Sequence, residues 1–306
     1  MASRFAGFMT HGAHHCRVLG VAVLLGAAIA AHAATGTLAS GSGSGAAPAS
    51  PPAAVSAAAN AGTEAAHGAV APASAAFTPD QRAGFAKQVE STLAHMGARV
   101  AILARVGRPP SEMPEGMHYT HVAFAVYSMI TTADRQQEPG YAIYNLYQKA
   151  GQPDRSELVQ DFPVNFFSEV ASLEAGILVP PPELQRRLLA VITSPTYRAL
   201  HEPRYSLIAN PYNADFQNCT EFVLDVIQAA IYQTDHLPTI KANTRAYFKA
   251  QPVKVSPLRL MLGSVFMREV SLRDHDGAPQ TATFERIADY LRDIDPATQV
   301  FTLRSP

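Results

Sequence analysis

Cys219 and His121 are the two residues of this sequence whose types could form a nucleophile and its base. The chain holds only two cysteines, and Cys16 falls in a predicted export signal, so the mature protein would carry one thiol without a partner. Exported proteins tend to pair their cysteines, so a leftover thiol suggests either a reactive group or an intermolecular link. The position of Cys219 at the start of a predicted helix favours the reactive group.

The residues after Cys219 predict an amphipathic helix over 219–233. Its inward face has helical spacing and comprises Cys219, Phe222, Val223, Val226, Ile227, Ala230 and Ile231. The same spacing predicts that Glu221, Asp225 and Gln228 face outward. In a first helical turn, free N–H groups and the helix dipole favour an anion, so we expect the thiol pKa to fall below its ordinary ~8.5.

His121 is the candidate base. In the strand predicted over 119–127, alternation places His121, Ala123 and Ala125 on one face. Two alanines beside the imidazole leave room for a helix, and we expect the helix headed by Cys219 to pack there.

Asn145 is the candidate that orients the imidazole. It lies on the next predicted strand, 141–148, and shares a face with Ile143 and Tyr147. A polar side chain there can bond to the imidazole and hold it. The alternative interpretation is an inert buried cysteine, which behaves as a small hydrophobe, and a satisfied core histidine.

Three short segments resemble the permuted papain-like families, namely the NlpC-like peptidase relatives and the lecithin:retinol acyltransferase-like proteins. They are Thr120-His121-Val122-Ala123-Phe124, Ile143-Tyr144-Asn145-Leu146 and Asn218-Cys219-Thr220-Glu221-Phe222. The resemblance implies a permuted papain-like core with Cys219 as nucleophile, His121 as base and Asn145 as orienting residue. The chain departs from the pattern because Ala123 replaces a usual glycine, Glu221 replaces a frequent histidine, and the third residue is an amide.

Longer segments resemble a bacterial domain of unknown function, number 2145. They are Gly140-Tyr141-Ala142-Ile143-Tyr144-Asn145-Leu146-Tyr147-Gln148 and Tyr205-Ser206-Leu207-Ile208-Ala209-Asn210-Pro211. This resemblance spans nearly the whole predicted domain and implies no activity.

The N-terminal composition predicts three parts of the chain. Residues 1–34 have two arginines, an apolar run of about 14 residues and an Ala-His-Ala site, which predicts a cleaved signal rather than a membrane anchor. Residues 35–76 are rich in Ala, Gly, Ser and Pro, which predicts a disordered linker. Residues 77–306 are long enough for one single-core domain. We expect a periplasmic or secreted protein without a transmembrane segment in its mature form.

The fold class predicted for residues 77–306 is α+β, with a small, mainly antiparallel sheet packed by helices. Thr78, Pro79 and Gln81 predict the start of a first helix that Gly97 ends. Strands are predicted over 100–106, 119–127 and 141–148. The helical segments predicted after them are 166–173, 183–192, 219–233 and 284–291.

Other patterns point to no cofactor or metal. His118 with Asp274 and His275 lacks zinc-ligand spacing. Arg105 and Arg108 are candidates for a substrate carboxylate, with a solvated strand edge as the default interpretation. Without the signal, the chain has 22 basic and 25 acidic residues. It has no basic cluster, so we expect no nucleic-acid partner.

The function expected from these residues is an exported thiol-dependent hydrolase or acyltransferase. Cys219 would form an acyl-enzyme with an amide or ester, with His121 as base. Export suggests a cell-envelope peptide or lipid as substrate. The alternatives are a non-catalytic exported binding domain that keeps a papain-like core, and a structural protein with an inert thiol.

Overall fold

A six-stranded antiparallel sheet forms the centre of the protein. The computed structural model describes residues 77–131, 134–254 and 268–305, which all belong to one compact unit, Pro51–Pro306. The predicted signal and linker, 1–34 and 35–76, lie outside the described residues. The strand order is β4-β3-β2-β1-β5-β8, and every neighbouring pair is antiparallel. The strands are β1 (Val100–Arg105), β2 (His121–Thr131), β3 (Gln137–Lys149), β4 (Gln152–Asp161), β5 (Glu174–Val179) and β8 (Gln299–Arg304).

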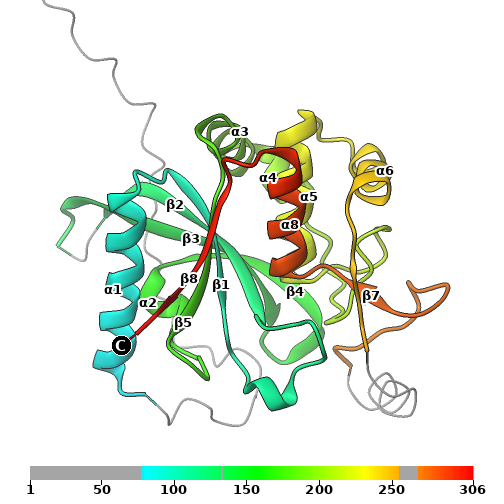
Figure 1. The fold of residues 1–306 in the computed structure, drawn as a ribbon, viewed down its shortest axis with the longest axis horizontal. Helices are drawn as coiled ribbons and strands as arrows, with labels where there is room; N and C mark the ends of the chain where they lie inside the picture. The colour runs from blue at the N-terminus through cyan, green and yellow to red at the C-terminus, as the bar shows by residue number, and fades with distance from the viewer. Residues whose placement is uncertain (1–76, 132–133, 255–267, 306) are drawn as a thin grey trace, which may run out of the picture. The chain divides into compact units, whose positions relative to one another are not determined.

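One face of the sheet is covered by α1 (Pro79–His95) and α2 (Pro163–Phe166) (Figure 1). Thr78 caps α1 in the predicted capping box, in which its hydroxyl accepts from the Gln81 N–H and the Gln81 side chain accepts from the Thr78 N–H. Apart from Tyr141, the covered strand residues are small or aliphatic. They are Ala101, Leu103, Ala123, Ala125, Ile143, Ala175, Ile177 and Val179.

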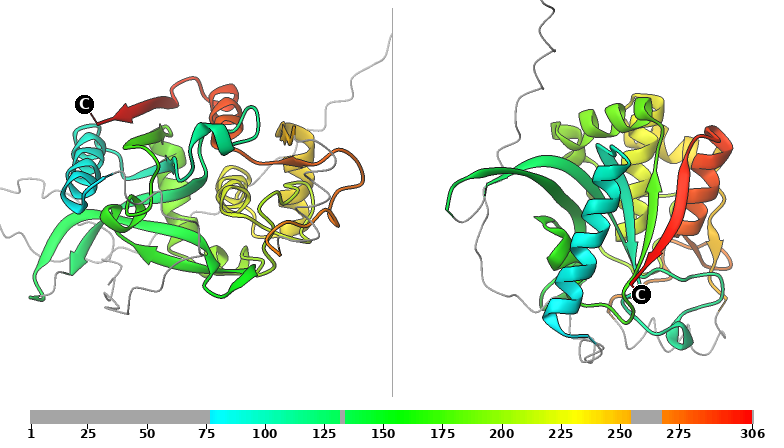
Figure 2. Two further views of the ribbon diagram at one scale, coloured as in Figure 1. Left: turned by 90° about the horizontal axis from the view of Figure 1, so that it is seen from below. Right: turned by 60° about the vertical axis from the view of Figure 1, so that its left-hand side comes forward.

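The other face is covered by α5 (Cys219–Tyr232), α3 (Pro182–Ile192) and α8 (Phe284–Ile294). Figure 2 shows these helices and α1 on opposite sides of the sheet. β2 contributes Val122, Phe124 and Val126 to this face. The smaller elements are the 3-10 helix η2 (Pro110–Glu112), α4 (Pro195–Ala199), α6 (Leu237–Tyr247), β6 (Gln251–Pro252) and β7 (Gln280–Thr281).

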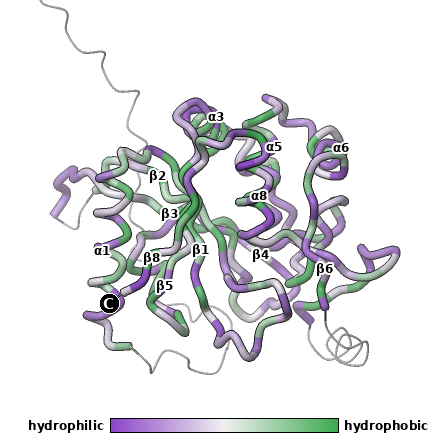
Figure 3. Tube along the Cα trace, in the orientation of Figure 1, coloured by the Kyte–Doolittle hydropathy of each residue, from purple (hydrophilic) through white to green (hydrophobic). Residues whose placement is uncertain are grey.

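The predicted fold class, α+β with an antiparallel sheet packed by helices, is confirmed. Hydrophobic residues concentrate where the strands meet at the centre of the sheet, while the helices show both hydrophobic and hydrophilic residues (Figure 3). Among the described helices, none has both the length and the apolar character needed to cross a membrane.

Two local predictions are wrong. The alanine face of β2 is not covered by the helix headed by Cys219, because Phe85 of α1 together with Phe166 and Phe167 fills the space that the alanines leave. The helix predicted over 166–173 is a single turn that ends at Phe166. Beyond it the chain is irregular, and the Ala171 N–H bonds to the Val106 carbonyl instead of to a helical partner.

Candidate active site

Cys219 is the first residue of α5, and Asn218 fixes its position there. The Asn218 Oδ1 accepts from the Glu221 N–H at 2.9 Å and caps the helix. Its Nδ2 donates to the Leu207 carbonyl and to Thr281 Oγ1, both at 3.1 Å. The first N–H groups of a helix have no intrahelical partner, so the Cys219 amide remains a donor at the helix start.

The Cys219 thiol is enclosed. The residue is 7 % exposed, and Sγ lies 3.8 Å from Thr220 Oγ1. Burial raises the thiol pKa above its ordinary value, while the Val122 N–H, the Thr220 side chain and N–H, and the Arg105 charge act in the opposite direction. The predicted fall of the thiol pKa is therefore wrong, because loss of water outweighs the helix start. At neutral pH the isolated thiol keeps its proton.

β2 and β3 separate beside this thiol. Their ladder ends with Phe124 opposite Tyr144, so Val122 lies beyond the last pair. The Val122 N–H instead acts on the Cys219 thiol and lowers its pKa. α5 thus meets the β2 backbone one residue after His121, although it packs on the face opposite the His121 side chain.

The His121 ring is held by its neighbours on the α2 side of the sheet. Its Nε2 lies 3.1 Å from Asn145 Oδ1. The ring stacks on Tyr147, with centroids 4.7 Å apart and planes within 6°, and Phe166 lies 5.5 Å away. His121 is 8 % exposed, so this packing defines one orientation of the imidazole.

Asn145 sets the tautomer of that imidazole. Its Nδ2 donates to Asp161 Oδ1 at 2.8 Å and to the Ile143 carbonyl at 3.3 Å, which leaves Oδ1 as the atom that faces His121. An amide oxygen only accepts, so the hydrogen-bond network assigns the proton of neutral His121 to Nε2. Nδ1 is then the nitrogen that can take up a proton.

Asp161 and Tyr147 complete a hydrogen-bonded chain behind His121. The Tyr147 hydroxyl donates to Asp161 Oδ2 at 3.1 Å. Burial raises the pKa of Asp161 to about 7, against the effect of the Tyr147 and Asn145 hydrogen bonds and the Arg105 charge. Burial also raises the pKa of Tyr147; the Arg105 charge lowers it, while the ionised forms of Asp161 and Cys219 raise it further.

Arg105 is the cation of the site. Its guanidinium donates to the Phe166 carbonyl and lies 5.4 Å and 5.9 Å from the ring centres of Phe166 and Tyr147. Arg105 was a candidate for a substrate carboxylate, and in the structure its charge lowers the pKa of both Asp161 and Cys219. The structure therefore brings Cys219, His121 and Asn145 to one end of β2 and β3 and adds Arg105 to them.

The site includes residues that sequence reasoning did not assign to it. Tyr147 was placed on the face of Asn145, and strand alternation could have identified it as a neighbour of His121. Asp161 and Phe166 carry no such signal, because they arrive through the β4–α2 connection. The metal combination considered for His118 does not form: His118 Nε2 bonds to Glu174 Oε1 at 2.5 Å.

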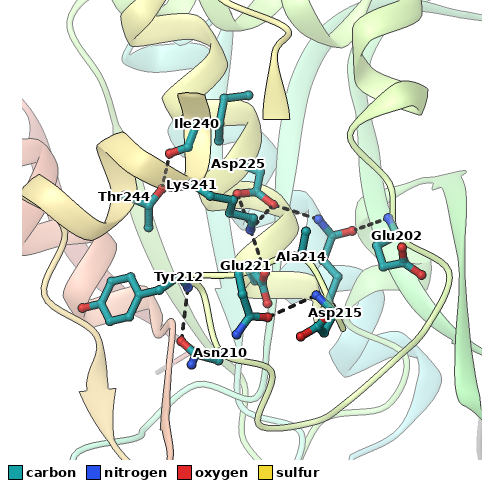
Figure 4. Close-up of polar contacts among 12 residues, drawn as sticks. Glu202, Asn210, Tyr212, Ala214, Asp215, Glu221, Asp225, Ile240, Lys241 and Thr244 are labelled. Carbon is teal, nitrogen blue, oxygen red and sulfur yellow. Dashed lines mark hydrogen bonds and ion pairs between the residues drawn. The ribbon is translucent and has the colours of Figure 1, made fainter. Parts of the chain in front are cut away.

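Glu221, Asp225 and Gln228 do not face outward as predicted. All three are fully buried, because α6 and α8 supply Lys241 and Tyr290 to the sides of α5 that do not face the sheet. Lys241 of α6 reaches between the two carboxylates, with Nζ 2.7 Å from Glu221 and 2.8 Å from both Asp225 oxygens (Figure 4). Glu221 begins this cluster two residues after the candidate nucleophile.

The comparisons with known proteins identify a family but no activity. No significant match was found among the curated proteins or the solved structures. Residues 92–291 match the family model described as "Uncharacterized protein conserved in bacteria (DUF2145)", and the chain belongs to this family.

Proposed function

We propose that the protein is a thiol-dependent hydrolase or acyltransferase with Cys219 as nucleophile and His121 as general base. The observation that carries the proposal is the hydrogen-bonded series His121–Asn145–Asp161, which holds an imidazole one residue before Val122, whose N–H lowers the pKa of the Cys219 thiol. A base with an orienting partner and a thiol at a helix start are the groups that nucleophilic catalysis uses.

The raised thiol pKa determines how the pair would act. A protonated thiol needs its proton removed during attack, so His121 Nδ1 takes the proton as Sγ bonds to the carbonyl carbon of an amide or ester. The carbonyl oxygen becomes an oxyanion, for which the Cys219 N–H is an available donor. His121 then returns the proton to the leaving amine or alcohol, and an acyl-enzyme forms. Water or another acceptor releases the acyl group.

The resemblance to permuted papain-like enzymes supports the same assignment. The shared features are a strand histidine, a polar residue on the next strand and a cysteine at the start of a helix packed on the sheet. We further propose that the protein is exported and acts on a cell-envelope peptide or lipid, because residues 1–34 have the pattern of a signal.

A second candidate function is a binding domain with this core and no turnover. The low exposure of both Cys219 and His121, below 10 %, favours it, because a substrate carbonyl needs access to the sulfur. Thiol reactivity distinguishes the two functions.

The test is the rate at which iodoacetamide alkylates Cys219 as a function of pH, with peptide mapping to separate Cys219 from Cys16. If His121 is the base, the rate rises with deprotonation of the imidazole, well below the ordinary thiol pKa of ~8.5. His121→Ala should then lower the rate near neutral pH by about 10²-fold, within the usual range for a general base. Added imidazole should restore part of the loss.

His118→Ala is the matched control, because His118 lies three residues away and pairs with Glu174 outside the site. It should leave the alkylation profile unchanged. Equal profiles for the unmodified protein and His121→Ala, or no labelling in the folded state, would contradict a catalytic pair and favour the binding domain.

A further inference from the structure

A cavity of about 330 Å³ lies beside the segment that leads into Cys219. It is lined by Asp154, Arg155, Arg204, Asp215, Phe216 and Arg273. Backbone contacts hold its walls together: Arg155 bridges to Arg204, and the Tyr205 N–H donates to the Asp154 carbonyl at 2.9 Å. Three separate parts of the chain thus place three guanidinium groups around one space.

Two of these arginines are not neutralised by the protein. Arg204 pairs with Glu202 at 2.9 Å, and the Asp154 carboxylate pairs with Arg268 at 2.9 Å. Within residues 77–131, 134–254 and 268–305, the Arg155 and Arg273 guanidiniums make no hydrogen bond or ion pair, and both residues are exposed. They are the groups available to a ligand.

The charge of the lining fits a monoanion. Three arginines against two aspartates leave one net positive charge. A guanidinium matches the planar, two-oxygen geometry of a carboxylate. A phosphate dianion would place more charge beside Asp215 than the lining can balance. Phe216 adds an apolar surface, with the Arg204 guanidinium 5.8 Å from its ring centre.

The cavity and the thiol share their neighbours in the chain. Phe216 is three residues before Cys219, and the Gln217 N–H between them donates to the Arg204 carbonyl at 2.9 Å. Tyr205 follows Arg204 and lies close enough to Cys219 for the thiolate charge to raise its pKa further, after the main effect of burial. A ligand in the cavity is therefore next to the segment that positions the sulfur.

We infer that this cavity binds the carboxylate of a peptide ligand through Arg155 and Arg273, with Phe216 against the adjoining side chain. That this peptide is the substrate attacked by Cys219 rests on the proposed function. The binding itself requires no chemistry at the thiol.

The test is calorimetric titration of the full-length Cys219→Ser protein, which cannot form the thioester. The probes are N-acetyl-alanyl-alanine, the same peptide with a C-terminal amide, and inorganic phosphate. The acid peptide should bind, and the amide should bind at least about tenfold more weakly, because it lacks the charge that the arginines recognise. The Arg155→Gln, Arg273→Gln double variant should lose a similar factor.

Arg186→Gln is the control, because Arg186 lies on the exposed surface of α3 and pairs with Glu183 there. It should bind the acid peptide normally. Equal binding of acid and amide, no binding at millimolar peptide, or full binding by the double variant would overturn the inference. Stronger binding of phosphate than of the acid peptide would also overturn it, because the cavity would then be a phosphate site. The titration uses Cys219→Ser and measures binding alone, so its result does not depend on thiol chemistry. The catalytic proposal is tested separately by the alkylation of Cys219.

Discussion

Asn145 decides which nitrogen of His121 carries its proton, and Asp161 decides the orientation of Asn145. Asn145 donates to Asp161, so the amide oxygen is left for the His121 Nε2 proton. Neither residue needs to touch a substrate to matter, because a rotated amide would offer His121 a donor and remove the tautomer that leaves Nδ1 basic. They are positioning residues for the proposed base.

Residue types and spacing selected Cys219, His121 and Asn145 as candidates, because they are a thiol, an imidazole and an amide among apolar neighbours, and their catalytic roles stay a prediction. The contribution of Asp161 could not be predicted. Its position depends on the register that places Asp161 opposite Ile143, and that pairing forms only when β4 folds back on β3. The burial of the Cys219 thiol could not be predicted either, since the segments that bury it are distant in sequence.

Replacement of Asp161 by Asn should change the pH dependence of stability. The pKa of Asp161 is about 7 in the folded protein, above its value of 3.8 in an unfolded chain, so folding favours the protonated carboxyl. That contribution is complete below the unfolded pKa and is lost as pH rises through about 7. The stability of the unmodified protein relative to Asp161→Asn should therefore fall between about pH 5 and about pH 8, on the order of 1–3 kcal/mol.

Thermal unfolding of both proteins at the two pH values measures this change. Glu183→Gln serves as the control, because the Arg186 and Arg187 hydrogen bonds lower the pKa of the exposed Glu183 carboxylate, and its stability difference should stay flat over this range. A flat difference for Asp161→Asn as well would mean that Asp161 does not take up a proton on folding.

At the scale of elements, α5 is the helix whose burial differs most from the burial that its sequence predicted. Hydrophobic spacing predicted its start, its inward stripe and, to within one residue, its end. It failed for Glu221, Asp225 and Gln228, because spacing identifies the face toward the sheet and carries no information on helices that pack against the other sides of α5. α6 and α8 bury these polar residues and supply their partners, Lys241 for the two carboxylates and Tyr290 for Gln228.

The strands show a similar limit. β1, β2 and β3 are rich in apolar and aromatic residues and were predicted. β4 is polar and half exposed along most of its length, and β8 is an edge strand with exposed alternate residues. Their pairing is dictated by the neighbours β3 and β5, which no local pattern specifies.

Glu221 and Asp225 should respond differently when their charge is removed. Lys241 supplies one positive charge to two buried carboxylates, and burial raises the pKa of Glu221 well above its usual range. Glu221 Oε2 is buried without a hydrogen-bond partner, so Glu221→Gln can place its NH₂ there at a cost within about 1 kcal/mol. Both Asp225 oxygens accept from Lys241, and Gln217 also donates to one of them, so Asp225→Asn directs its NH₂ at a donor.

We expect Asp225→Asn to lower the free energy of unfolding by about 2–4 kcal/mol, since it leaves Lys241 buried without a full counter-charge. Urea unfolding of the matched pair at neutral pH gives both values. Equal losses for the two variants would show that the two carboxylates share the charge evenly.

At the scale of the whole molecule, the residues matched by the family model do not include every element of the folded unit. The matched residues 92–291 omit most of α1 and all of β8. In the structure, α1 buries Phe85 and Val89 against the alanine face. β8 pairs along the length of β5, and Arg304 bonds to Glu174 at 2.9 Å. Both elements complete the packing around the strands that carry the site.

A fragment that spans 92–291 should therefore fail to unfold cooperatively, whereas the chain from residue 77 to 306 should do so. Removal of most of α1 exposes the apolar side chains beneath it, with a cost of about 1.5–3 kcal/mol for each large residue. Removal of β8 leaves the β5 edge unpaired and open to association. Calorimetry and sedimentation of the two fragments measure cooperativity and aggregation together. The longer fragment isolates the effect of the missing elements, because neither fragment contains residues 1–76. If the 92–291 fragment unfolds in one transition at the same midpoint temperature as the longer fragment, α1 and β8 are not needed for a stable core.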